Sequence, residues 1–211
     1  MRNTIALVAA IAAAFGLSTS PADAGLVEYA FSGQVTDFEG AGAGMWSGVT
    51  VDDRWTVSAI IDMDAEDENS NPNISRRRLE SLSLTIGSLT DTGWTDRTIW
   101  IFSTSSLHQF SVSGEYNDGN TGAIWRLSLG LRDSTESIFD DDTLPMDLSL
   151  DDFDDTSFSL ERITALFNGD VGDPFELNGT IDSVTVNPVP GPGGLAIGCW
   201  LLAFGQRRKR E

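Results

Sequence analysis

Cysteine, lysine and histidine are almost absent from this chain of 211 residues, and each scarcity excludes a chemistry. The one cysteine, Cys199, lies in an apolar stretch near the C-terminus, so the rest of the chain has no disulfide, cysteine-based zinc site or thiol nucleophile. Lys209 is the only lysine, which leaves the preceding residues without Schiff-base or phosphate-lysine chemistry. His108 is the only histidine, and we expect it at a surface or a strand edge.

The sequence also lacks the common catalytic motifs. No G-x-S-x-G elbow, H-E-x-x-H zinc motif or G-x-x-x-x-G-K-[ST] loop occurs. A secreted hydrolase that uses paired carboxylates stays open as an alternative, because acidic residues are abundant and their pairing is spatial. We therefore expect no enzyme and no cofactor, with Ca²⁺ as the one ion that the composition suggests.

Residues 1–24 have the features of a secretory signal peptide. Arg2 supplies a positive start, and Ile5–Phe15 is an uncharged apolar run of 11 residues. Ala22 and Ala24 place small residues where signal peptidase reads them, which predicts a signal helix cleaved after Ala24. The alternative is a transmembrane helix, but the run is well short of the roughly 20 residues that a bilayer core requires.

Residues 25–187 are strongly acidic. They hold eight arginines and 30 aspartates and glutamates, a formal charge of 8 − 30 = −22. Such a charge repels phosphate backbones and excludes nucleic acid as a partner. It suits either divalent counter-ions or simply a solvated surface.

The same residues have the pattern of a β protein. Apolar and polar residues alternate over short runs that are separated by Gly, Asn and Asp, and no run has the 3.6-residue period of an amphipathic helix. The expected strands are Leu26–Thr36, Trp55–Ile61, Leu79–Leu89, Thr98–Ser103, Leu107–Ser113, Ala123–Leu131, Phe158–Leu166 and Phe175–Val186. This spacing predicts one all-β domain, an antiparallel β-sandwich or jelly-roll-like body.

Two loops are rich in acidic residues. Asp62, Asp64, Glu66 and Glu68 alternate, and their oxygens would suit Ca²⁺. The EF-hand spacing fails, because the loop has no Gly at its sixth position and no Glu at its twelfth. The second acidic loop is Asp133–Asp155. Solvated turns are the alternative for both.

Tryptophans suggest a second kind of binding. Trp46 and Trp94 lie in Gly-flanked, loop-like settings, where exposed rings could stack on sugars. We expect the tryptophans within strands, Trp55, Trp100 and Trp125, to belong to the core.

Residues 188–211 form three successive pieces. A Pro/Gly run precedes the apolar block Leu195–Phe204, and a basic cluster ends the chain; the cluster is Arg207, Arg208, Lys209 and Arg210. Extended to 14 residues, the block would make a helix of roughly 21 Å, which is short of the ~30 Å hydrocarbon core. The bases would hold its end on the cytoplasmic side. We expect a short transmembrane helix that is removed, and an ordinary anchor is the alternative.

This tail resembles the C-terminal sorting signal of PEP-CTERM proteins, which are exported bacterial proteins processed by exosortases. The resemblance is carried by Val189, Pro190, Gly191 and Pro192, the apolar block and the basic cluster, with Gly191 where the family has Glu. YAFSGQVTDFEG, LPMDLSLDDFDDTSFSL and GTIDSVTV resemble the β-rich domains of that group. The resemblance implies export, transient membrane insertion and processing by an exosortase-like enzyme.

The sequence therefore predicts an exported extracellular or cell-surface protein. The resemblance implies a structural or interaction component of an exopolysaccharide or biofilm matrix, with extracellular polysaccharide as a partner. A glycan- or calcium-binding module and the carboxylate hydrolase remain the alternatives.

Overall fold

The computed structural model describes residues 25–40, 46–104, 107–118, 123–134, 138–139, 143–164 and 175–189. Leu26–Val189 forms one compact unit. The expected signal helix with Ala22 and Ala24, and the tail from Pro190 through the basic cluster, lie outside the described residues. No helix among the described residues is long and apolar enough to cross a membrane.

The described body is a single antiparallel sheet. Its strands are β1 (Leu26–Glu39), β2 (Arg54–Asp62), β3 (Ile74–Arg78), β4 (Ser81–Ile86), β5 (Leu89–Asp91), β6 (Thr95–Thr104), β7 (Leu107–Asp118), β8 (Ala123–Asp133), β9 (Asp155–Thr164) and β10 (Phe175–Pro188), with a 3₁₀ turn η2 (Leu150–Asp152). Their order across the sheet is β3-β6-β7-β8-β9-β10-β1-β2-β4-β5. The expected all-β antiparallel class is confirmed, whereas the sandwich or jelly-roll form stays a prediction.

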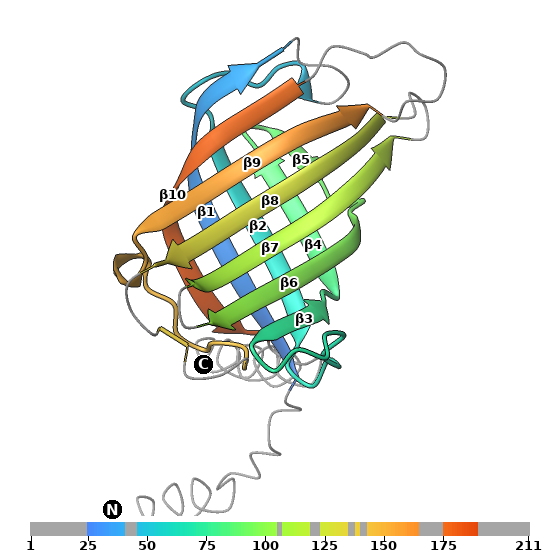
Figure 1. The fold of residues 1–211 in the computed structure, drawn as a ribbon. Helices are drawn as coiled ribbons and strands as arrows, with labels where there is room; N and C mark the ends of the chain where they lie inside the picture. Colours follow the sequence, from blue (N-terminus) through green and yellow to red (C-terminus); the bar gives the residue numbers. More distant parts are fainter. Residues whose placement is uncertain are drawn as a thin grey trace, which may run out of the picture. The chain divides into compact units, whose positions relative to one another are not determined.

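The sheet curls so that its two halves face each other across the core. In Figure 1, β6–β9 lie in front of β1, β2 and β4, and the strands of the two halves cross. Inward rings from the two halves meet: the centroid of Tyr29 in β1 lies 5.0 Å from that of Phe110 in β7. Burial of such apolar side chains is the main force that stabilises this arrangement.

Alternation along each strand builds this core. Burial alternates along β2, where Trp55, Val57, Ala59 and Ile61 are all buried. Leu82, Leu84 and Ile86 do the same in β4. Because successive side chains of a strand point to opposite faces, the intervening Ser and Thr residues face outward.

Two strands differ from the sequence-based expectation. The predicted strand Leu79–Leu89 is interrupted at Gly87, whose φ of 57° allows a tight turn, so β4 and the short β5 form a hairpin. The edge strand β3 was not predicted at all, because its sequence ISRRR has no apolar alternation. The segment is a strand because it pairs with β6, with Ile74 opposite Phe102 and Arg78 opposite Thr98.

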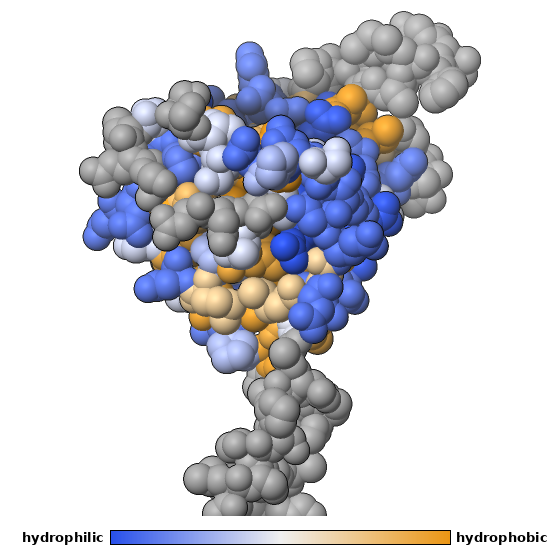
Figure 2. Space-filling view, turned by 60° about the horizontal axis from the view of Figure 1, so that its bottom comes forward, coloured by the Kyte–Doolittle hydropathy of each residue, from blue (hydrophilic) through white to orange (hydrophobic). Residues whose placement is uncertain are grey.

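The acidic segment between β8 and β9 is anchored to the core. Leu144, Leu148 and Phe153 are buried, and the Tyr29 hydroxyl donates a hydrogen bond to the Pro145 carbonyl at 2.7 Å. Figure 2 shows one end of the body, with hydrophilic residues along its sides and hydrophobic residues across its middle and lower part.

Candidate functional site on the outer face of β3, β6 and β7

The two tryptophans expected to stack on sugars are buried. Trp46 is 0% exposed and Trp94 is 1% exposed. The Trp94 ring packs inward, with its centroid 6.4 Å from that of Tyr116. Their Gly-flanked segments suggested exposed loops, but the apolar rings fold into the core. The expectation that these two rings form a glycan site is wrong.

The four expected calcium ligands do not converge. Asp62 Oδ1 accepts a hydrogen bond from its own loop, from the Asp64 amide at 2.9 Å. Glu68 accepts from Arg78 Nε at 2.6 Å and pairs with Arg76 at 3.7 Å. Within the described ranges, no three His, Cys, Asp or Glu side chains gather in a way that could hold a metal ion. The alternating acidic pattern therefore forms turns and ion pairs here, and the predicted calcium site is not formed.

Asp67 organises this loop, and it was not among the predicted site residues. Its Oδ1 accepts hydrogen bonds from the amides of Asn69 at 2.8 Å and Arg76 at 2.9 Å. Burial works to raise the pKa of Asp67, but the two amides, the Ser75 hydroxyl and the Arg77 charge together hold that pKa below its usual value. The i, i+2 spacing of Asp and Asn in DENSNPN was the available signal for these Asx turns.

His108 is buried, at 9% exposed, rather than at a surface or edge. Its Nδ1 accepts a hydrogen bond from the Phe139 amide at 3.4 Å. Alternate residues of a strand share one face, so His108 points inward with Phe110 and Val112 of β7, which explains its burial. Its place in the core makes it a structural residue of the described body.

Trp100 was expected in the core, but it lies on the outer face of the sheet. In the sequence TIWIFS, both alternating sets of residues contain apolar side chains, so the pattern does not say which set faces the core. The structure turns Ile99 and Ile101 inward. Trp100 and Phe102 therefore share the outer face, and both are half-buried. Their ring centroids are 5.9 Å apart and their planes differ by only 6°.

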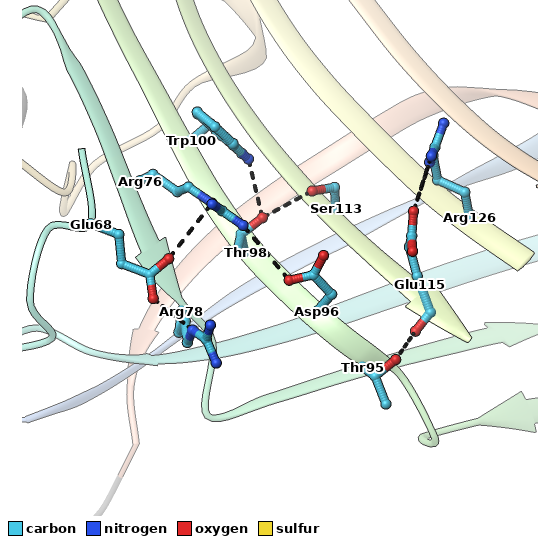
Figure 3. Close-up of polar contacts among 10 residues, drawn as sticks. All are labelled: Glu68, Arg76, Arg78, Thr95, Asp96, Thr98, Trp100, Ser113, Glu115 and Arg126. Carbon is cyan, nitrogen blue, oxygen red and sulfur yellow. Dashed lines mark hydrogen bonds and ion pairs between the residues drawn. The ribbon is translucent and has the colours of Figure 1, made fainter. Parts of the chain in front are cut away.

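Polar contacts hold Trp100 in place, as Figure 3 shows. Its Nε1 donates to Thr98 Oγ1 at 3.1 Å, and the Arg76 guanidinium carbon lies 5.1 Å from the ring centroid. Glu68 and Asp96 pair with Arg76, each at 3.7 Å. These carboxylates offset the arginine charge, and the cation–π contact orients the indole.

Uncharged side chains continue from the rings across the sheet. The register places Ser111, Gly130 and Ser157 in line with Trp100 on β7, β8 and β9. The next row contains Thr98, Ser113, Ser128 and Ser159. Thr98 and Ser113 share a hydroxyl hydrogen bond of 3.1 Å.

On β7, β8 and β9, charge returns only beyond these two rows, whereas on β3 the same rows contain Arg76 and Arg78. Arg126 pairs with Glu115 at 3.0 Å on one side, and Arg132 lies opposite Gln109 on the other. The outer face therefore combines two parallel aromatic rings with a neutral, hydroxyl-bearing strip. No family model, curated protein or solved structure matches the chain.

Proposed function

We propose that the protein is an exported structural or interaction component of an extracellular polysaccharide or biofilm matrix, without enzymatic activity. In this proposal, signal peptidase removes residues 1–24, and an exosortase-like enzyme processes the tail after transient insertion of its apolar block in the membrane. The folded body, a sandwich of jelly-roll type, is then secreted or held at the cell surface. The tripartite C-terminal sequence carries this proposal.

One observation on the body supports processing at both ends. The Val189 amide donates to the Leu26 carbonyl at 2.9 Å, so the start of β1 and the end of β10 lie side by side. The register of β1 with β10 reaches Val27 opposite Pro188. The expected cleavage point after Ala24 and the motif that begins at Val189 therefore both adjoin the ends of this paired ladder. Cleavage at either point would leave the ladder complete.

The arrangement of charge supports a non-enzymatic role. Carboxylates such as Asp67, Glu68 and Asp154 bind loop amides, arginines or hydroxyls of their own chain. These contacts order loops and do not present a pair of free carboxylates to a substrate.

Mass spectrometry of the protein released by a host with an exosortase tests the proposal. We expect a mature N-terminus at Gly25 and a C-terminus between Pro188 and Pro192. The matched variant replaces Arg207, Arg208, Lys209 and Arg210 by serine, and we expect it to lose C-terminal processing but keep cleavage after Ala24. Released wild-type protein that still ends at Glu211 would refute the sorting step.

A further inference from the structure

We propose that residues 67–73, called here the edge cover, close the outer edge of β3 and so prevent a second copy of this chain from joining its sheet there. The surface in question is the backbone of β3, and the partner that it would accept is β3 of another copy. The proposal goes beyond the matrix role, because it concerns what keeps copies of the folded body apart.

The order of the strands leaves the described sheet with two edges, β3 and β5. An edge strand carries unpaired backbone N–H and C=O groups, which can pair with a strand of another molecule. β5 has only three residues, and the Asp91 carboxylate ends it by accepting the Gly93 amide at 2.8 Å. β3 has five residues. It is therefore the edge along which a second copy could add.

The backbone groups of Arg76 point away from the sheet. In an antiparallel pair, successive residues direct their N–H and C=O alternately toward the partner strand and away from it. The Arg76 amide donates to Asp67 Oδ1 at 2.9 Å, and the Arg76 carbonyl accepts from the Glu68 amide at 2.8 Å. Two residues earlier, the Ile74 amide donates to the Asn71 carbonyl at 3.0 Å. The edge cover thus occupies the hydrogen-bonding positions that an added strand would use.

The edge cover does not offer a new edge in place of β3. Its own amides are taken up by side chains of the same segment: Asn69 donates to Asp67 Oδ1 at 2.8 Å, Asn71 to Asn69 Oδ1 at 3.0 Å and Asn73 to Asn71 Oδ1 at 3.0 Å. Side-chain oxygens that bind the amide two residues on form tight turns, in which the backbone is not extended. A strand of another copy would therefore find no regular ladder here.

Charge on β3 adds to this protection. The Glu68 carboxylate of the edge cover pairs with Arg76 and Arg78, as Figure 3 shows. Without the cover, two copies of β3 that pair antiparallel about Arg76 would place these side chains opposite each other, and like charges in that position are destabilising. On the other face of β3, Arg77 donates to the Ala65 carbonyl at 2.9 Å. Charged side chains on an edge strand are a common device against edge-to-edge pairing.

Sedimentation velocity of the full chain tests the proposal with a matched pair of variants. Both carry Arg76→Thr and Arg78→Thr, which remove the repulsion between copies and keep strand-forming residues. One adds Asp67→Ala, which removes the acceptor for the amide of residue 76, and the other adds Asp67→Asn, which keeps an oxygen there. We expect the alanine variant to self-associate at least tenfold more tightly than the asparagine variant or the wild type. All carry the same apolar tail, so association through the tail does not affect the comparison.

Amide hydrogen exchange identifies the surface that joins the copies. Residues 74–78 should exchange more slowly in the associated alanine variant than in the same protein diluted to the monomer. Arg76→Pro in place of Arg76→Thr should abolish the association. Proline removes the outward N–H and leaves the bonds to β6 in place, because an edge strand tolerates proline where its N–H faces away from the sheet.

Thermal melting identifies any variant that fails to fold. Should Asp67→Ala do so, Glu68→Pro takes its place, because proline removes the donor to the carbonyl of residue 76; its match is Glu68→Ala, which keeps that amide. A folded alanine variant that stays as monomeric as the wild type would overturn the proposal. Equal association of the two matched variants, or association that leaves the exchange of residues 74–78 unchanged, would also overturn it.

Discussion

Trp55 in β2 stacks on Phe158 in β9, with ring centroids 4.0 Å apart and planes 10° from parallel. The two strands are separated in the sheet by β1 and β10, so the indole reaches across both. Gly33 in β1 and Gly179 in β10 permit this reach. A Cβ would lie 2.5 Å from Trp55 Cζ2 at Gly33 and 2.8 Å from Trp55 Nε1 at Gly179. The sheet can therefore curl here because Gly33 and Gly179, which have no side chain, leave room for the large Trp55 ring.

We expect Gly33→Ala to destabilise the body more than any other glycine-to-alanine change along β1 or β10. The new methyl group would lie 1.8 Å from the Thr180 carbonyl oxygen, so the backbone itself would have to move. Overpacking of this kind costs about 1–3 kcal/mol or more. Urea unfolding measures the effect. The control is Gly48→Ala, since nothing lies within 4 Å of a Cβ at Gly48, and a similar loss in both variants would contradict the role of Gly33.

Arg97 joins the start of β6 to the connection between β3 and β4. Its guanidinium donates to the carbonyls of Leu79 at 2.9 Å, Trp94 at 2.9 Å and Glu80 at 2.6 Å. We expect Arg97→Ala to lower the free energy of unfolding by roughly 2–4 kcal/mol, because charge-assisted bonds are lost and carbonyls lose their partners.

The control for Arg97 is Arg54→Ala. Arg54 is 70% exposed and pairs with Asp182 across the outer surface. Exposed pairs of this kind contribute about 0–1 kcal/mol. Equal losses in the two variants, measured by urea unfolding, would show that the Arg97 contacts do not hold this end of the sheet.

Period-two alternation was sufficient to predict most of the strands and much of the core. Leu82, Leu84 and Ile86 are buried as expected, and so are Trp55 and Trp125. The pattern failed where both phases are apolar, as at Trp100, or where both are charged, as in β3. Side chains there take the face that register with the neighbouring strand assigns, and register is a property of the whole sheet.

The candidate site was missed for the same reason. Trp100 was assigned to the core because it lies within an expected strand, Phe102 was not singled out, and the neutral rows beside them come from three separate strands. In the acidic loop, by contrast, the sequence predicted a site that the structure does not form. Alternating carboxylates have the composition of a calcium site, but Glu68 is oriented by Arg76 and Arg78 on β3, a strand that the sequence did not reveal.

Because folding lowers the pKa of Asp67, we expect its carboxylate to stabilise the folded state at neutral pH and to lose this contribution in acid. Its carboxylate is favoured in the folded state, so its contribution is complete above the unfolded-state pKa of about 3.9 and is lost as pH falls through the lower folded-state pKa. Asp67→Asn keeps an oxygen acceptor for the two amides but removes the charge.

Urea unfolding from pH 7 to pH 2 should therefore show the wild type more stable than Asp67→Asn near neutrality, with the difference shrinking below about pH 4. Glu66→Gln is the control, because it removes a carboxylate of the same loop without touching the contacts of Asp67. A difference between wild type and Asp67→Asn that stays constant over this range would contradict the assignment.

Tyr29 gives the opposite dependence on pH. It is 0% exposed, and burial raises the pKa of its phenol well above the usual value. A raised folded-state pKa means that the stabilising contribution is complete below the unfolded-state value of about 10 and is lost as pH rises further. We therefore expect the wild type to lose stability more steeply than Tyr29→Phe above about pH 10.

At neutral pH the same variant should be less stable than the wild type. It loses the hydrogen bond from the Tyr29 hydroxyl to the Pro145 carbonyl, which typically contributes about 0.5–1.5 kcal/mol. It keeps the ring that packs on Phe110. The two stability curves should therefore converge in alkali, as measured by urea unfolding at pH 7 to pH 11. Parallel curves over that range would show that the hydroxyl is not protected from ionisation by its place between β1 and the segment at Pro145.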